Sequence, residues 1–122
     1  MVLEIAKKRY VELFGPTVGD KVRLADTDLI IEVEKDLLKY GDELVFGGGK
    51  SVRDGLGQAS GVMRDESADL VITNTIVLDP VLGIIKADIG VKDGKILAVG
   101  NAGNPNVMDD VDIIVSSNTE II

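Results

Sequence analysis

The segment at residues 47–51 reads Gly-Gly-Gly-Lys-Ser and ends like a phosphate-binding loop, whose backbone N–H groups would cradle phosphate oxygens. That motif requires a glycine five positions before Gly49, where this chain has Leu44. It also requires a helix directly afterwards, whereas Gly55 and Gly57 interrupt the next turns. A flexible glycine turn that leaves a strand therefore explains the segment better than a nucleotide site does.

Carboxylates form three clusters that could hold a divalent cation: Asp26 with Asp28, Glu32 with Glu34 and Asp36, and Asp109 and Asp110 with Asp112. A calcium loop needs a glycine at its sixth position and a distal glutamate. Counting from Asp26, the sixth residue is Ile31, and the third cluster also lacks the spacing. We therefore expect solvated carboxylates on loops and strand faces. A carboxylate pair for general acid–base catalysis stays open as an alternative, although no spacing singles one out.

The hydroxyl groups lack a partner that could activate them as nucleophiles. The chain contains no histidine and no cysteine, which removes the commonest general base, the commonest metal ligand and every thiolate site. No strand–Ser–helix elbow is visible either. A lysine with a lowered pKa is left as an alternative. A self-contained catalytic site is therefore not expected at the candidate serines Ser51, Ser60, Ser116 and Ser117.

Composition limits the class of protein further. The length of 122 residues fits one domain, and 45% hydrophobic with only 3% aromatic residues predicts an aliphatic core. Thirteen basic against 21 acidic residues give a net charge of −8, which argues against nucleic-acid binding. No apolar run approaches the roughly 18 residues of a membrane span, and the N-terminus does not resemble a secretory signal. We therefore expect a cytoplasmic location and no membrane partner.

The first half of the chain predicts one helix followed by short strands. Apolar residues recur at helical spacing over 3–14, and Gly15-Pro16 ends the pattern. Strands are predicted at 21–24 and 29–33, with a weaker one at 42–46, whereas 34–40 is ambiguous between a helical turn and a loop. From 47 to 68 the periodicity disappears. Such a long glycine-rich loop is usually functional, disordered, or ordered by a partner.

The second half predicts strands, and the fold class is mainly β (α+β). Asp93-Gly94 is the strongest turn signal in the chain and predicts a hairpin. A chain that ends in an apolar strand pattern is expected to be a piece of something longer; the alternative is a last strand at the edge of a complete sheet. The predicted segments are two apolar stretches within 69–78, strands at 83–91, 95–99, 111–115 and 120–122, and a loop at 100–105.

Several long motifs resemble one known family. Residues 14–27 (FGPTVGDKVRLADT) and 40–50 (YGDELVFGGGK) are similar to the opening of the urease alpha (catalytic) subunit, as are Arg53-Asp54-Gly55 and Gly57-Gln58. Residues 87–96 resemble a β-hairpin of the wider amidohydrolase superfamily, and Gly103-Asn104-Pro105 also fits the urease pattern. The resemblance covers nearly the whole chain.

The resemblance implies an activity whose residues are missing here. Ureases hydrolyse urea to ammonia and carbamate at two nickel ions, held on a barrel by histidines, an aspartate and a carbamylated lysine. The first histidine pair of the family would follow the point where this chain stops. None of the lysines considered (Lys50, Lys86, Lys92 and Lys95) matches the carbamylated position. No catalytic, cofactor-binding or metal residue is therefore expected in this chain, and nickel is expected only for the intact enzyme.

The resemblance also implies a fold and partners. It suggests a short N-terminal helix followed by part of the β-rich domain that flanks the amidohydrolase barrel, with the barrel itself absent. Residues 1–122 would form a single incomplete domain, divided into 1–46, 47–68 and 69–122. Its partners would be the rest of the alpha subunit and the smaller urease subunits, in an oligomer. The alternatives are a stand-alone urease-derived interaction or assembly module without catalysis, and a small enzyme that uses carboxylates or a lysine.

Overall fold

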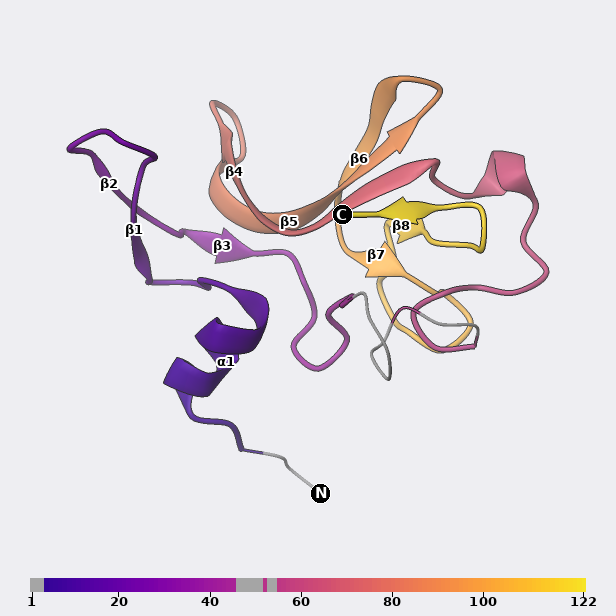
Figure 1. Ribbon diagram of the computed structural model, residues 1–122, viewed down its shortest axis with the longest axis horizontal. Helices are drawn as coiled ribbons and strands as arrows, with labels where there is room; N and C mark the ends of the chain where they lie inside the picture. Colours follow the sequence, from indigo (N-terminus) through magenta and orange to yellow (C-terminus); the bar gives the residue numbers. More distant parts are fainter. Residues whose placement is uncertain (1–3, 46–51, 53–54) are drawn as a thin grey trace.

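The computed structural model describes residues 4–45, 52 and 55–122. This part of the chain is mainly β, as the sequence predicts, with one α-helix and one short 3₁₀ helix (Figure 1). The helices are α1 (Lys7–Phe14) and η1 (Arg64–Glu66). The strands are β1 (Lys21–Arg23), β2 (Ile30–Glu32), β3 (Lys35–Asp36), β4 (Leu70–Asp79), β5 (Gly83–Lys92), β6 (Lys95–Gly100), β7 (Ala102–Gly103), β8 (Ile113–Ile114) and β9 (Glu120–Ile121).

The N-terminal helix is shorter than the sequence predicts. It begins at Lys7 rather than at residue 3, because Ala6 has an extended backbone with φ −59° and ψ 137°. Residues 1–3 lie outside the described residues. The helix ends at Gly15, whose φ of 84° lies in the left-handed region that glycine adopts without steric cost. The sequence signal for the end of the helix is confirmed, and the signal for its start is wrong.

A five-stranded sheet forms the centre of the molecule. Its strands run in the order β3-β5-β4-β9, and β6 pairs with the second half of β5. The long antiparallel pair of β4 and β5 extends from Leu70 opposite Val91 to Asp79 opposite Gly83. The two apolar stretches predicted within 69–78 are one strand, which continues through a bulge where Asn74 has a φ of 52°. The bulge bends the strand and gives the sheet its curvature (Figure 1).

The predicted hairpin turn is confirmed. Asp93 and Gly94 connect β5 to β6 with φ values of 51° and 74°. Positive φ at both central residues is the geometry of a type I′ turn, which matches the right-handed twist of the two strands.

Three short segments differ from the sequence prediction. Residues 35–36, in the segment predicted as a helical turn or a loop, form β3, which pairs in parallel with β5. The segment 42–45 is not a strand, because the Leu44 carbonyl accepts from the Asn74 side-chain amide instead of a neighbouring strand. Residue 46 lies outside the described residues. Strand β7 falls inside the predicted loop 100–105 and pairs with β8.

The hydrophobic core is aliphatic, as the composition predicts. Its main cluster is formed by side chains from β4, β7, β8 and the residue after β8, together with Leu44 and Ala68 from the connecting segments before β4. The described part of the glycine-rich loop is firmly attached, since Ala68 donates its N–H to Ile114 and the hydroxyl oxygens of Ser67 and Ser116 lie 2.8 Å apart. The main cluster consists of Leu44, Ala68, Val71, Ala102, Ile113 and Val115, and the other buried apolar residues that the structure describes are Val33, Leu38, Ala59, Ile85 and Ala87.

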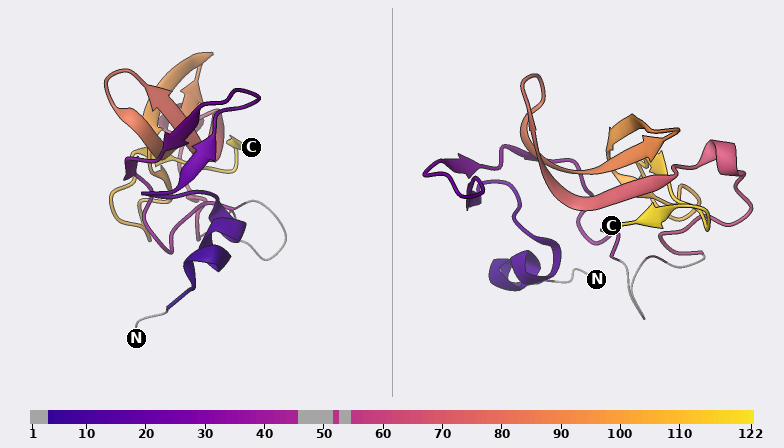
Figure 2. Two further views of the ribbon diagram at one scale, coloured as in Figure 1. Left: turned by 90° about the vertical axis from the view of Figure 1, so that its left-hand side faces the viewer. Right: turned by 45° about the horizontal axis from the view of Figure 1, so that its top comes forward.

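The N-terminal elements lie at one end of the molecule. Helix α1 and the two-stranded β1–β2 hairpin are at the opposite end from β7, β8 and η1 (Figure 2). The central strands β4 and β5 connect the two ends, and the segment from β3 to Leu44 forms a second connection, through Tyr10–Glu43 on one side and the core on the other.

Candidate functional site

The predicted carboxylate clusters lie mostly in solvent. Asp26 and Asp28 are exposed in the turn between β1 and β2, and Glu32 and Glu34 are also exposed. Asp36 is the exception, since it is half-buried and accepts hydrogen bonds from the Thr17 hydroxyl at 2.7 Å and the Leu38 N–H at 2.8 Å. In the third cluster, Asp109, Asp110 and Asp112 are exposed, and the first two lie 3.7 and 3.5 Å from the Lys39 ammonium.

The candidate nucleophiles are dispersed. Ser60 and Ser117 are exposed, whereas Ser116 is buried against the hydroxyl of Ser67. Lys92 donates to the Arg64 carbonyl at 2.6 Å, and Lys95 is exposed on β6. The glycine-rich run 47–51, with Lys50 and Ser51, lies outside the described residues.

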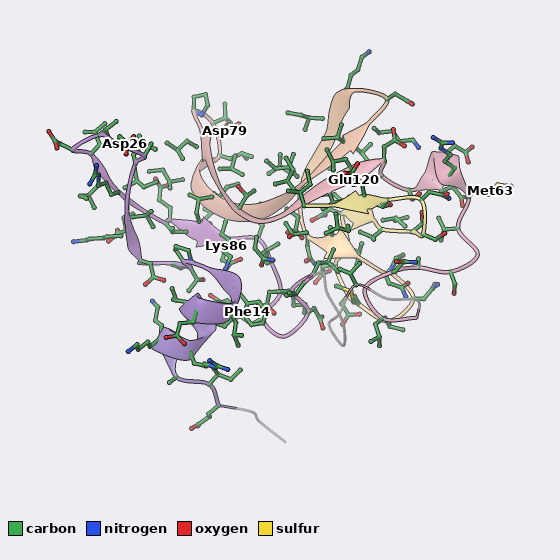
Figure 3. All side chains as sticks on the ribbon, viewed as in Figure 1. Phe14, Asp26, Met63, Asp79, Lys86 and Glu120 are labelled. Atoms are coloured by element: carbon green, nitrogen blue, oxygen red, sulfur yellow. The ribbon has the colours of Figure 1, made fainter. Side chains whose placement is uncertain are left out.

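The structure brings together a polar cluster that the sequence did not reveal, centred on Lys86. This side chain on β5 is fully buried, and its ammonium donates to the Gly15 carbonyl at 3.4 Å. The ammonium also lies 5.2 Å from the centre of the Tyr10 ring, within the range of a cation–π interaction. In Figure 3 the Lys86 side chain lies between the sheet and α1.

Two tyrosines complete this cluster. The Tyr10 hydroxyl donates to the Glu43 carboxylate at 2.5 Å, and its ring packs edge-on against Tyr40 with 5.4 Å between centres. The Tyr40 and Thr17 hydroxyl oxygens lie 2.9 Å apart. The cluster therefore connects α1 and the turn after it to the segment between β3 and the core.

Burial decides the protonation of this cluster. Desolvation lowers the pKa of Lys86, although the carboxylates of Asp36 and Glu43 oppose the shift. Burial, followed by the hydrogen bond to Glu43, raises the pKa of Tyr10 above its ordinary range. Tyr10 is therefore a neutral hydrogen-bond donor at physiological pH.

Asp88 is a second buried charge, two residues further along β5. It is 1% exposed, and its carboxylate accepts from the N–H groups of Asn74 at 2.9 Å and Ala102 at 3.0 Å. Burial raises its pKa to about 6, against the opposing effect of those two N–H donors. Asp88 thus connects the bulge in β4 to the start of β7.

These groups hold the fold together and offer little for chemistry. Lys86 and Asp88 are covered, so no substrate reaches them in this conformation. Within the described ranges no group of three or more histidine, cysteine, aspartate or glutamate side chains could hold a metal ion. A depression of about 270 Å³ presents a single carboxylate, that of Asp42, among apolar and glycine residues. Its lining is Gly41, Asp42, Leu56, Gly57, Val107 and Met108.

A sequence signal for the buried charges did exist. Lys86 and Asp88 interrupt an apolar strand pattern two residues apart, so they share one face of β5. Because Ile85 and Ala87 on the other face are also buried, β5 is covered on both sides and its charges must be internal. Their partners are more than ten residues away in the chain, and only the tertiary structure identifies them.

The helices are too short to cross a bilayer. Across residues 4–45, 52 and 55–122, none has the length and apolar character of a membrane span.

Comparison with known proteins assigns the chain to a family. The family model described as "Urease alpha-subunit, N-terminal domain" matches residues 3–122. The urease subunit alpha of Sulfurisphaera tokodaii is 58% identical over 120 residues, which is 98% of this chain and 22% of that protein. The urease subunit alpha of Haloarcula marismortui is 54% identical over 122 residues, with 99% and 22% covered.

The chain thus spans about a fifth of the length of these relatives. The matched region is the N-terminal domain, in agreement with the motifs at 14–27 and 40–50. The chain belongs to the urease alpha-subunit family and corresponds to its N-terminal domain.

Proposed function

We propose that this chain is the structural N-terminal segment of an enzyme that hydrolyses urea to ammonia and carbamate at a dinuclear nickel site. The observation that carries the proposal is the identity of 54–58% to urease alpha subunits across nearly all of the chain. Because the chain spans 22% of those relatives, the residues that perform the chemistry would come from elsewhere in the subunit.

The residues of this chain do not fit a nickel centre. Nickel sites in proteins favour imidazole ligands, and the chain contains no histidine. The described carboxylates do not gather into a group of three that could hold a metal ion. We therefore propose that no catalytic, cofactor-binding or metal residue lies in these 122 residues, and that the chain by itself is inactive.

The geometry favours a structural role for this chain instead. The side chain of Lys86 connects β5 to the end of α1, and the side chain of Asp88 connects β5 to β4 and β7. We propose that residues 1–122 form one incomplete domain of the β-rich part beside the barrel. The rest of the alpha subunit and the smaller urease subunits would complete it, within a cytoplasmic oligomer.

The intact mass of the denatured natural protein tests this proposal. A mass several times the 13.0 kDa of this chain would support it. A mass of 13.0 kDa would favour the alternative, a separate interaction or assembly module without catalysis. A pure 122-residue sample provides the second arm, in which we expect no bound nickel and no ammonia released from urea. Urea hydrolysis by that sample would overturn the proposal.

A further inference from the structure

We propose that the N-terminal helical segment, residues 4–15, detaches from the sheet as a separate unit while the sheet stays folded, and that the buried side chain of Lys86 controls this detachment. The detachment follows from contacts within the described residues.

Helix α1 is intrinsically weak. Its eight residues are fewer than the roughly 12–15 that an isolated helix needs in water. Ala6 at the N-cap makes no side-chain hydrogen bond to the first turn. Lys7, Lys8 and Arg9 stand in that first turn, where positive charge opposes the helix dipole. The described residues bury no side chain of α1, so within this chain its conformation depends on a few contacts.

Those contacts are polar and aromatic. Lys7 pairs with Asp20 at 2.9 Å and donates to the Val18 carbonyl at 3.4 Å, and the others converge on one place. The Tyr10 hydroxyl donates to Glu43, and the Tyr10 ring meets Tyr40. The Gly15 carbonyl accepts from the Lys86 ammonium, which also lies over the Tyr10 ring. Lys86 is thus the group on the sheet that contacts both the middle and the end of the segment.

The rest of the fold does not depend on the segment. The main hydrophobic cluster runs from Leu44 to Val115, and the buried residues Val33 and Leu38 also lie outside the segment. The ten-residue strands β4 and β5 pair with each other and with β3, β6 and β9. Gly15, with φ 84°, provides a hinge at the end of α1. The segment can therefore leave without exposing the core.

Lys86 couples the sheet to the segment 4–15 in the closed state, in which the segment lies against the sheet. Its ammonium is fully buried, and a buried cation is stable only when hydrogen bonds and nearby charges replace its hydration. The Gly15 carbonyl, the Tyr10 ring and the carboxylates of Asp36 and Glu43 do so here. A methionine at this position would keep the apolar stem but lose the charge and the hydrogen bond. The closed state would lose its link to the Gly15 carbonyl and the Tyr10 ring.

Hydrogen exchange followed by mass spectrometry tests the inference on the full natural protein that carries this chain. In the unaltered protein, peptides covering residues 7–15 should exchange faster than those covering 70–79 and 83–92. Lys86→Met should accelerate exchange at 7–15 by about tenfold or more, with little change in β4 and β5. Lys95→Met is the matched control, because Lys95 is exposed on β6; it should leave both rates unchanged.

Two results would overturn the inference. Uniform acceleration of all peptides by Lys86→Met would mean that α1 and the sheet unfold as one unit. No acceleration at residues 7–15 would mean that Lys86 does not hold the segment. Should Lys86→Met fail to fold, Tyr10→Phe keeps the ring and removes only the bond to Glu43. It should accelerate exchange at 7–15 by about three- to tenfold, and an unchanged rate would equally overturn the inference.

Discussion

The carboxylate of Asp88 accepts a 3.0 Å hydrogen bond from the backbone N–H of Ala102, and this bond joins the middle of β5 to the first residue of β7. The other carboxylate oxygen accepts from Asn74 in the β4 bulge. One buried side chain therefore fixes the relative position of three strands.

The stability of the protein should fall as pH rises through about 6 because of Asp88. Its pKa is about 6 in the folded protein and about 3.8 when unfolded, so the folded state binds the extra proton between these values. The stabilisation that protonated Asp88 gives the folded state is present in full below pH 3.8 and is lost as pH rises through 6. Its size is about 3 kcal/mol of unfolding free energy. The charged groups facing Asp88 are Lys86, which opposes the shift, and Asp36, which adds to it.

Guanidinium unfolding at several pH values between 4 and 8 measures this dependence. Asp88→Asn is the control, because it removes the titration and should flatten the curve. The carboxylates with lowered pKa, Asp20, Asp69 and Asp79, act in the opposite direction, but their effect appears only as pH falls below about 3.8. An unfolding free energy that rises between pH 4 and 7 would contradict the prediction.

The Asp93-Gly94 turn should not tolerate a β-branched side chain. Gly94 has a φ of 74°, where valine is strained, so Gly94→Val should lower the unfolding free energy by roughly 1–3 kcal/mol. Gly94→Asn is the matched variant, since asparagine tolerates the left-handed region, and it should cost clearly less. Thermal unfolding checks both. Equal melting temperatures for the valine and asparagine variants would refute the turn geometry.

Gly90 on β5 should be sensitive to substitution because a side chain there would clash with its neighbour, not because of its φ angle. A Cβ atom there would lie 2.8 Å from Cγ2 of the fully buried Ile113, closer than carbon atoms pack. Gly90→Ala should therefore cost roughly 1–3 kcal/mol through overpacking. Ile113→Ala opens space at the same point, so the double variant should lose less than the sum of the two single losses. Additive losses would show that the two residues are not coupled.

Alanine substitution of two valines near opposite ends of β4 should have very different effects on stability. Val71 is 0% exposed in the core, and Val81, in the turn after the strand, is 89% exposed. Val71→Ala should destabilise the protein by roughly 1.5–3 kcal/mol, because its buried methyl groups are lost. Val81→Ala should change stability by less than about 0.5 kcal/mol. A large loss for Val81→Ala in the natural protein would instead identify that turn as a contact with another part of that protein.

Local patterns in the sequence determined much of the fold. The β-class follows from the runs of branched aliphatic residues, and the turn at Asp93-Gly94 follows from the rule that positive φ favours these residue types. The end of α1 at Gly15 has the same physical origin. These features depend on neighbouring residues only, which is why local sequence patterns specify them. The urease family was recognisable from the motifs at 14–27 and 40–50, because their length makes chance agreement negligible.

The tertiary structure alone decided the features that depend on distant residues. The start of α1 follows from the extended backbone at Ala6, and β3 exists because Lys35 and Asp36 meet β5. The acceptor of Lys86 is the carbonyl of Gly15, which lies 71 residues earlier, directly after α1. Hydrogen bonding and desolvation act through space, whereas sequence patterns register only neighbours along the chain. The buried polar cluster could therefore be suspected from the charges within an apolar strand, but its partners could be identified only once the chain was folded.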